Sequence, residues 1–555
     1  MRAIAAIVAL AGVAAGCGDS PALGRQAAAE RAQTRSGEAA ALQVSDGLKA
    51  AMASALASAT DAGILPLYGP EPAPFWIEQG TLGPDGREAL ALLGGAADEG
   101  LEPADYDTTR LATWAATTAA PAATLASLDV ALSRGMLRYL RDVHVGRVDP
   151  AALGFRMRLP PDAHDFVAVL RAARAAHRLT AAAAEMRPAV GQYDALRAML
   201  VRYRALAVSE PGPLPEPAKS VRPGDQYSAI AALSARLAAL GDLPPEAATR
   251  AGAATYAQPV ADAVARFQRR HGLDADGVLG ARTIRDLNVP LAWRARQIAL
   301  ALERLRWLPD LGDEPLIAIN VPMFHLWGWD AKPGRQAPSL DMAVIVGRAA
   351  RSETPVIDEA LRTVIFRPFW NVPRSILRKE ILPAIARDAG YLDRENMEVV
   401  DGVTDAATPV AVTDAALARL REGTLRVRQR PGPKNALGLV KFVFPNPDDI
   451  YMHATPAQAL FARSRRDFSH GCVRVERPVA LAEWVLRQLP DWTPDRIAEA
   501  MNGAHTVEVR LAQPIRVILF YTTAAVMSAD GAMHFAEDIY GRDRALDAAL
   551  QAARR

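Results

Sequence analysis

One cysteine and two histidines lie close together in residues 451–474 and could form a nucleophilic site. Cys472 ends the tetrapeptide Ser469-His470-Gly471-Cys472, and His453 precedes it by 19 positions. A thiol must lose its proton before it attacks a carbonyl carbon, and imidazole is the side chain best suited to accept that proton near neutral pH. These residue types therefore predict a cysteine nucleophile with a histidine base.

The residues alone leave the identity of the base open. His470 is two positions from Cys472 and would share a face with it in an extended segment. His453 ends a strand-like run and could reach the thiol from across the fold. For Cys472 itself, the alternative is an inert buried thiol that packs as a small hydrophobic group.

The residues after the cysteine favour a helix over 479–489. A cysteine at a turn that enters a helix would have a lowered pKa, because the positive helix end stabilises a thiolate. Backbone N–H groups at such a turn could also hold an oxyanion. We therefore expect the thiol of Cys472 to be activated by the following helix.

The overall charge and the first residues limit the function classes. The 555 residues include 64 basic and 62 acidic side chains, a balance that argues against a nucleic-acid binder driven by a strong global field.

A basic start and a short apolar run predict an export signal over 1–17. Its end, Ala14-Ala15-Gly16-Cys17, resembles a bacterial lipobox, although Ala14 replaces the usual Leu or Val; lipidation of Cys17 and ordinary cleavage both stay open. In an oxidising compartment the single remaining cysteine, Cys472, is unexpected unless it has a use.

Composition divides the rest of the chain. An Ala-rich flexible tether is expected over 18–45 and a helical scaffold over 46–210. Closely spaced prolines predict a stiff, extended linker over 211–224. A compact helical module is expected over 225–290, and a mostly β domain over 296–545 with a charged, helix-rich insertion, plausible as a lid, at about 383–430. The predicted strands are Leu316–Val321, Met342–Val346, Thr363–Phe366, Leu439–Phe444, Ile450–His453, Val507–Leu511 and Ile515–Tyr521, and a hairpin is expected at Ser528-Ala529-Asp530-Gly531.

The helical module resembles the three-helix peptidoglycan-binding domain. The residues that carry the resemblance run from Phe267-Gln268 through Gly272-Leu273 and Asp276-Gly277 to Gly280 and Thr283. Taken one by one, Phe267, Leu273 and Leu287 are expected to be core residues. The resemblance implies binding to wall glycan.

Residues 451–474 resemble the active-site motif of the L,D-transpeptidases. That motif is a histidine, about 14–17 intervening residues and [S/T]HGC; here 15 residues separate His453 from Ser469. The segment Asn435–Asn446 and the order of domains resemble the large multidomain members. The resemblance implies that His453 is the general acid/base and Cys472 the nucleophile. Gly471 and Cys472 fall where the family places its oxyanion-hole amides, and His470 and Ser469 would support the loop. Arg474 stands where the family often has Asn, and two roles stay open for it, contact with a substrate carboxylate and a structural salt bridge; Tyr451 is a further candidate for support of the site.

The predicted protein is thus a multidomain α+β enzyme: a helical scaffold, a small peptidoglycan-binding module and a mostly β L,D-transpeptidase domain with an inserted capping subdomain. The resemblance implies a thioester at Cys472 and 3→3 cross-links in peptidoglycan, with a tetrapeptide stem as donor and a diamino-acid amine as acceptor, in the periplasm or cell envelope. The alternatives are an L,D-carboxypeptidase, a transferase that attaches wall proteins, and a non-catalytic wall-binding scaffold.

No cofactor or metal is expected, because the histidines form no ligand-spaced cluster and no HExxH. The aromatic residues Trp327, Trp329 and Phe369-Trp370 could line a substrate groove or pack in the core.

Overall fold

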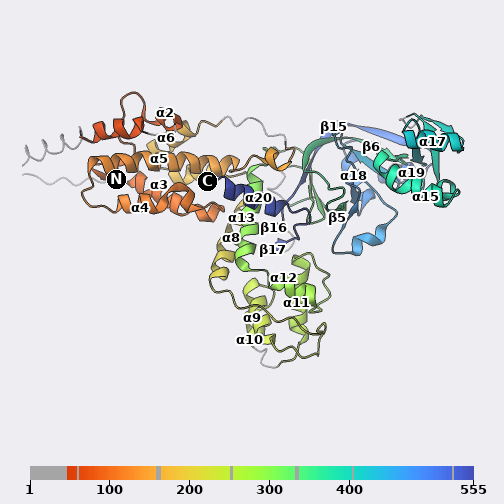
Figure 1. Cartoon of the computed structure of the whole chain (residues 1–555), viewed down its shortest axis with the longest axis horizontal. Coiled ribbons are helices and arrows are strands. Elements are labelled where there is room, and N and C mark those ends of the chain that lie inside the picture. Colours follow the sequence, from red (N-terminus) through yellow and green to blue (C-terminus); the bar gives the residue numbers. More distant parts are fainter. Residues whose placement is uncertain are drawn as a thin grey trace, which may run out of the picture. The chain divides into compact units, whose positions relative to one another are not determined.

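The computed structural model describes most of the chain after residue 46 (Figure 1). The predicted export signal, Cys17 and the tether lie outside the described residues. The chain divides into two compact units, which we treat separately; the first comprises residues up to Leu93, Tyr106–Leu137 and Phe166–Leu179, and the second the remainder. Among the described residues, no helix is long and apolar enough to cross a bilayer. The described ranges are 47–58, 62–157, 164–249, 254–331, 337–402, 406–527 and 531–554.

The first unit is a helical bundle with one small hairpin. Its centre is a buried carboxylate, Asp129, on helix α5. Asp129 accepts hydrogen bonds from the Tyr68 hydroxyl at 2.7 Å and from the Trp76 amide at 2.7 Å. A buried carboxylate is tolerated when such donors replace water, so Asp129 fixes the hairpin against α5. The elements are α2 (Leu65–Tyr68), α3 (Pro84–Gly94), α4 (Thr108–Ala115), the first part of α5 (Ala122–Val145), α6 (Phe166–Ala175), β1 (Ile77–Glu78) and β2 (Thr81–Leu82).

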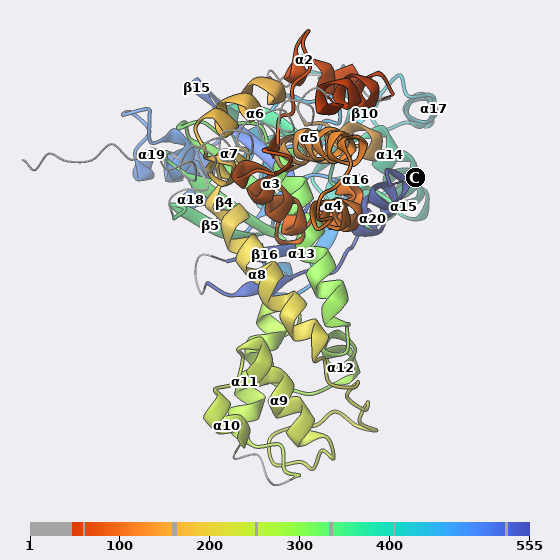
Figure 2. The ribbon, with the colours of Figure 1, turned by 90° about the vertical axis from the view of Figure 1, so that its left-hand side faces the viewer.

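In the second unit, helices α8 (Gly191–Val208) and α13 (Leu291–Arg306) lie side by side (Figure 2). Their contact includes a buried polar group: the Arg306 guanidinium donates to the Tyr193 hydroxyl at 2.9 Å and to Glu303 at 2.8 Å. Because the guanidinium is fully paired, its burial between two helices is tolerated. The short α7 (Leu179–Glu185) precedes α8, and α20 (Arg542–Ala552) ends the chain.

The predicted three-helix module has a fourth, short helix. It consists of α9 (Ile230–Leu240), α10 (Pro245–Thr249), α11 (Gln258–Arg270) and α12 (Ala281–Leu287), gathered in one cluster in Figure 1. The hydrogen bonds of Gln268 explain why the motif of this module contains a glutamine, a glycine and a threonine at these positions. Its amide donates to Thr283 Oγ1 at 3.1 Å and to Val278 O at 3.0 Å, and its carbonyl oxygen accepts from the Gly277 amide at 2.8 Å. Gln268, Gly277 (φ +69°) and Thr283 therefore hold the loop between α11 and α12.

The proline-rich segment packs on this module. Leu214 exchanges two backbone hydrogen bonds with the Asn288 side chain, at 2.7 and 2.8 Å, and Val221 pairs with Leu279 through a β-bridge. Leu214 is only 3% exposed. The segment is extended, as the prolines predict, but it is bound along much of its length.

The remaining sheet closes on itself. Its strands follow the order β5-β14-β12-β11-β6-β15-β3-β4, and β4 pairs again with β5, while β13 pairs with β5 in parallel. Apolar side chains of the inner face, among them Val364, Phe442 and Val473, are 0% exposed and form the core. The strands are β3 (Leu316–Asn320), β4 (His325–Trp329), β5 (Leu340–Gly347), β6 (Ile357–Phe366), β11 (Val440–Val443), β12 (Met452–His453), β13 (Asp467–Ser469), β14 (Val473–Val475) and β15 (Val507–Phe520); helices α18 (Pro478–Leu486) and α19 (Pro494–Asn502) precede β15.

The two strands predicted at Val507–Leu511 and Ile515–Tyr521 are one strand, β15. Its pairing with β6 shifts register between Arg510 and Ile515. Pro514 lies in this irregular stretch, and proline cannot donate to a strand ladder. The prediction was wrong because the chain passes the proline with a bulge instead of a turn. The predicted C-terminal hairpin has strands β16 (Ala524–Val526) and β17 (Met533–Phe535), while residues 528–530 lie outside the described residues.

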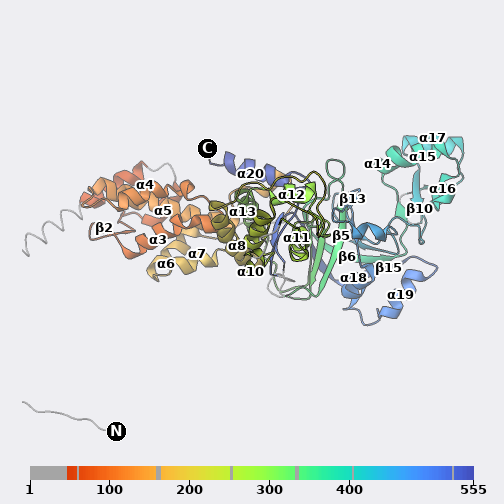
Figure 3. The same cartoon turned by 90° about the horizontal axis from the view of Figure 1, so that it is seen from below.

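The inserted subdomain has its own sheet and core (Figure 3). We call residues 370–429 the capping subdomain; it begins earlier than the predicted residue 383. Val399, Leu420 and Val427, each at most 1% exposed, belong to its core, against which Trp370 also packs. Its elements are β7 (Trp370–Asn371), α14 (Arg374–Ile376), a π-helical turn (Leu377–Ile381), α15 (Leu382–Arg387), α16 (Tyr391–Arg394), β8 (Met397–Asp401), β9 (Thr408–Val410), α17 (Asp414–Glu422) and β10 (Arg426–Gln429).

Candidate active site

Strand register brings the candidate nucleophile and base to neighbouring positions on adjacent chain segments. Strands β12 and β14 are parallel, with Met452 opposite Val473 and His453 opposite Arg474. Met452 and Val473 are 0% exposed and point into the core. Because successive side chains of a strand point to opposite faces, His453 lies on the outer face, and Cys472 directly precedes β14, one position before the residue that pairs with Met452.

His453 is held in one tautomer. Its Nδ1 lies 2.6 Å from the carbonyl oxygen of Ala454, which can only accept a hydrogen bond, so Nδ1 carries the proton. Nε2 then keeps a lone pair, as a general base requires. The side chain is 4% exposed. Burial lowers the pKa of His453 to about 3, and the positive charges of Arg474 and Lys441 act in the same direction.

The thiol of Cys472 is partly buried and free. Its Sγ lies 3.7 Å from the carbonyl oxygen of Asp449. Burial raises the pKa of Cys472 above its usual range; the backbone N–H and the hydroxyl of Tyr451 favour the thiolate and offset part of this effect. At neutral pH the thiol of Cys472 and the imidazole of His453 are therefore both neutral in the resting state.

The predicted helix effect on the thiol is wrong. Cys472 is followed by strand β14, and α18 begins only at Pro478. A helix dipole acts over the first turn of its helix, so α18 cannot lower the pKa of this thiol. The charges that favour the thiolate come from neighbouring strands instead.

Lys441 is one of these charges, and the sequence pattern did not single it out. It lies on β11, directly opposite His453, and its Nζ is 3.8 Å from the centroid of the Tyr451 ring. Lys441 and Arg474 both favour the thiolate of Cys472 and both disfavour the imidazolium of His453. No sequence pattern could have found it, because Lys441 comes opposite His453 only through the pairing of β11 with β12.

Hydrogen bonds within the loop before Cys472 fix its shape. Ser469 Oγ donates to the Cys472 carbonyl oxygen at 2.6 Å and accepts from the Gly471 amide at 3.2 Å. Gly471 has φ +116°, a conformation that side chains disfavour, and a Cβ there would lie 3.1 Å from Ile450 Cδ1. Ser469 and Gly471 thus shape the turn that presents the thiol.

A second layer supports this loop. Thr354 Oγ1 donates to the Gly471 carbonyl oxygen at 2.7 Å and accepts from the Gly347 amide at 2.9 Å. The Tyr540 hydroxyl donates to the Gly347 carbonyl oxygen at 2.6 Å. Thr354 is 0% exposed, so these bonds are shielded from water. The sequence did not indicate Thr354 or Tyr540 as supporting residues, because both are distant from Cys472 along the chain.

His470 points toward the capping subdomain. Its Nε2 lies 2.7 Å from Glu380 Oε1, in the π-helical turn, and its side chain is 37% exposed. The two predicted candidates for the base are thus in different surroundings: His453 is buried beside the thiol face, and His470 pairs with a carboxylate.

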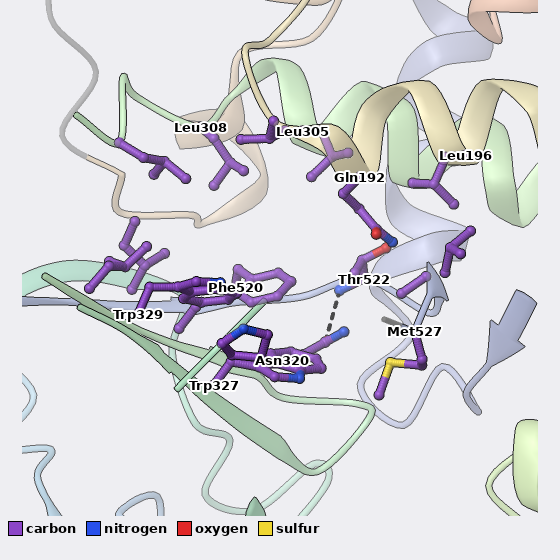
Figure 4. A pocket seen from close by; sticks show the side chains of 18 of the residues that line it. Gln192, Leu196, Leu305, Leu308, Asn320, Trp327, Trp329, Phe520, Thr522 and Met527 are labelled. Carbon is purple, nitrogen blue, oxygen red and sulfur yellow. Dashed lines mark hydrogen bonds between the residues drawn. The ribbon is translucent and has the colours of Figure 1, made fainter. Parts of the chain in front are cut away.

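Two of the tryptophans considered for a substrate groove line a different cavity. Trp327 and Trp329 contribute, with Phe520, to a largely apolar cavity of about 190 Å³ between β3, β4 and β15 and helices α8 and α13 (Figure 4). Around the closed sheet, these strands lie on the wall opposite β11, β12 and β14. Phe369 stacks with Arg428, whose guanidinium is 4.3 Å from the ring centroid. Among the described residues, no group of three or more His, Cys, Asp or Glu side chains could hold a metal ion.

Three family models match the chain. A "Scaffold domain" matches residues 66–200, a "Putative peptidoglycan binding domain" matches 226–287, and an "L,D-transpeptidase catalytic domain" matches 315–509. The chain is also 32% identical over 254 residues to a Haemophilus influenzae protein named "Putative L,D-transpeptidase". That match covers 46% of this chain and 49% of the relative, so the chain spans about half the length of the curated relative that it matches.

The closed sheet up to the start of β15, with His453 on β12 and Cys472 directly before β14, thus falls within the region that matches the L,D-transpeptidase catalytic domain. The chain thus contains a region similar to the L,D-transpeptidase catalytic domain, preceded by regions similar to a scaffold domain and a peptidoglycan-binding domain. The predicted fold class, a helical N-terminal region and a helical module followed by a mostly β catalytic domain, is confirmed.

Proposed function

We propose that this protein forms 3→3 cross-links in peptidoglycan through a thioester at Cys472. One observation supports the proposal: the register of β12 and β14 brings His453 near the start of β14, which Cys472 directly precedes, and the Ala454 carbonyl oxygen accepts the proton of Nδ1, so that Nε2 can act as the base. A thiol and an imidazole so placed can act as nucleophile and general base. The catalytic and peptidoglycan-binding domains of the chain support this substrate.

In the first step the neutral imidazole of His453 takes the thiol proton while Sγ attacks a carbonyl carbon. That carbonyl belongs to the L-centre of the diamino acid at position three of a tetrapeptide stem. The bond to the terminal D-alanine breaks, and the imidazolium gives its proton to the leaving amine. The products are free D-alanine and a thioester at Cys472.

In the second step the side-chain amine of another stem attacks the thioester carbonyl. His453 accepts a proton from the amine, the C–S bond breaks, and the thiolate leaves and recovers that proton. Lys441 and Arg474 favour a thiolate and therefore make it a better leaving group. Water as acceptor would give an L,D-carboxypeptidase, and an amine of a wall protein would give an attachment reaction.

The backbone amides of Gly471 and Cys472 are our candidates for the oxyanion donors. The Gly471 amide donates to Ser469 Oγ, a partner that a substrate oxygen would replace. In this proposal Tyr451 interacts with the sulfur, Arg474 supplies charge, and Ser469 and His470 support the loop. A role in wall synthesis places the enzyme in the cell envelope; export through residues 1–17 and lipidation of Cys17 stay predictions.

Product analysis tests this function. Incubation of the protein with disaccharide-tetrapeptides should give 3→3 dimers and free D-alanine, identified by mass spectrometry. Cys472→Ala should give neither dimer nor thioester adduct, whereas Arg510→Gln, an exposed change on β15, should behave like the wild type. Tripeptides without dimers would indicate the carboxypeptidase instead, and a dimer-forming Cys472→Ala variant would exclude the thioester.

A further inference from the structure

A second cavity lies where the peptidoglycan-binding module meets the closed sheet. It has a volume of about 310 Å³ and is lined by the end of α11 and the start of α12, by the loops around 322–325 and 464–466, and by the β16–β17 hairpin with the residues after it. None of the strand residues that form the candidate active site lines it. It is therefore a separate site on the same unit.

The lining is strongly basic. Five arginines contribute to it, with a single carboxylate, Glu537. The arginines are Arg269, Arg270, Arg282, Arg465 and Arg466. Such a concentration of guanidinium groups around a hollow is typical of sites for carboxylate or phosphate groups.

Carboxylates of the protein neutralise only part of this charge. Arg270 bonds to Asp242, with Nε and Oδ1 2.9 Å apart, and Arg465 bonds to Asp467 at 2.7 Å. Glu537 lies between Arg465, at 3.1 Å, and Arg282, at 3.7 Å. These three carboxylates thus contact only three of the five guanidinium groups, and a net positive charge remains.

Arg466 carries part of the excess. Its guanidinium donates only to carbonyl oxygens: those of Val344 at 3.2 Å, Arg463 at 2.7 Å and Phe324 at 3.1 Å. Among the described residues, neither Arg466 nor the exposed Arg269 forms an ion pair. Burial lowers the pKa of Arg466, and the attraction of Glu476 offsets part of that effect. An anion in the cavity would reduce this cost of burying positive charge.

Apolar groups complete the lining. Leu273 from the module, Phe324 from the loop after β3, and Phe535 from β17 contribute to it. A ligand with both carboxylates and apolar or ring surfaces fits such a lining better than a bare anion does. Arg466 also connects the cavity to the active-site loop, because its carbonyl oxygen accepts from the Val346 amide at 3.0 Å and β13 begins at the next residue.

We propose that this cavity is a second peptidoglycan site that binds the free carboxylates of a stem peptide. The inference rests on the proposed function, since stem peptides are the substrate named there. Stem peptides carry carboxylates at their D-alanine and diamino-acid residues, and these could pair with Arg269 and Arg466, which contact no carboxylate among the described residues. A stem bound in this cavity is held by the peptidoglycan-binding module and the catalytic domain together.

The test is a calorimetric titration of the full chain carrying Cys472→Ala, so that no turnover occurs, with a disaccharide-tetrapeptide. We expect two binding events. Arg269→Gln combined with Arg282→Gln should weaken one of them about tenfold, since two charge contacts are lost. Glu537→Gln should strengthen the same event, because it removes a repelling carboxylate. Opposite effects of these changes cannot both come from misfolding.

Arg285→Gln is the matched control, because Arg285 is an exposed arginine of α12 that does not line the cavity. Equal binding by all variants and this control would overturn the inference, as would a ligand with amidated carboxylates binding unchanged. Inorganic phosphate that binds as tightly as the muropeptide would show a general anion site instead. The titration is independent of the product assay: 3→3 dimers with no effect on this binding would refute only this site, and no dimers would refute the proposed function.

Discussion

His470 and Glu380 join the loop that carries Cys472 to the capping subdomain, with Nε2 and Oε1 2.7 Å apart. The contact gives the histidine next to the cysteine a carboxylate partner. His453, by contrast, is buried on the strand beside the thiol with its Nδ1 bonded to a backbone carbonyl. The two imidazoles are therefore expected to respond differently to mutation.

Loss of His453 should cost more activity than loss of His470. We expect His453→Ala to reduce kcat for dimer formation by roughly 10²–10⁴-fold, the usual contribution of a general acid/base. His470→Gln should reduce it by less than about tenfold, because that residue supports the loop. Steady-state kinetics with disaccharide-tetrapeptide measures both. A larger loss in His470→Gln would reverse the assignment of the base.

The activity should depend little on pH near neutrality. Cys472 and His453 together hold one proton, on the thiol, at any pH between the pKa of His453, about 3, and the raised pKa of Cys472. Above the pKa of His453 the imidazole is neutral and can act as base; below the pKa of the thiol a proton remains for the leaving amine. A profile of kcat/KM against pH should therefore show no inflection near the ordinary histidine pKa of about 6.5. An acid limb at that pH would contradict so low a pKa for His453.

Arg474→Gln should move both limbs of this profile upward. Its positive charge disfavours the imidazolium, so removing it raises the pKa of His453. The same charge favours the thiolate, so removing it also raises the pKa of Cys472. Alkylation of Cys472 by iodoacetamide across a pH series reports the thiol directly. Arg510→Gln, far more exposed, is the control, and equal profiles for the two variants would argue against an electrostatic role for Arg474.

Thr354→Val should loosen the loop that carries the nucleophile. The change leaves the Gly347 amide and the Gly471 carbonyl without their buried partner, at a cost of about 1–3 kcal/mol. We expect a lower thermal midpoint and slower thioester formation. Thr354→Ser keeps the hydroxyl and should restore both, which a purely steric effect of the methyl group would not allow.

Asp242→Asn should destabilise the second unit more strongly than Thr354→Val does. Asp242 and Arg270 are 2% and 8% exposed, and removing one partner leaves a buried charge uncompensated, at a cost of roughly 3–5 kcal/mol. Thermal unfolding measures the effect. Asp274→Asn, an exposed change in the same module, should leave the midpoint within about 1 °C, since surface changes of this kind are usually near neutral. Equal thermal midpoints for Asp242→Asn and Asp274→Asn would show that the positive charge of Arg270 does not depend on Asp242 for compensation.

Several elements could be predicted because their signals are local. A strand is predicted around Leu316 and around Met342, and a helix at Val264–Arg270, from residues that are only a few positions apart. Residue types and spacing also predicted a cysteine nucleophile with a histidine base, whereas the choice of His453 over His470 and the names of the domains came from resemblance to known families. The break in β15 at Pro514 was misjudged, because a bulge within one strand and a turn between two strands share the same residue signal.

By itself the sequence indicated which side chains are candidates for chemistry and which kinds of domain surround them. Only the tertiary structure decided how they are activated: strand β14, not a helix, follows Cys472, and Lys441 comes opposite His453 through strand pairing. The support from Thr354 and Tyr540 and the basic cavity at the module likewise depend on segments far apart in the chain. Charge and burial act through space, so the pKa values of the thiol and the imidazole follow from the folded arrangement and not from the order of residues.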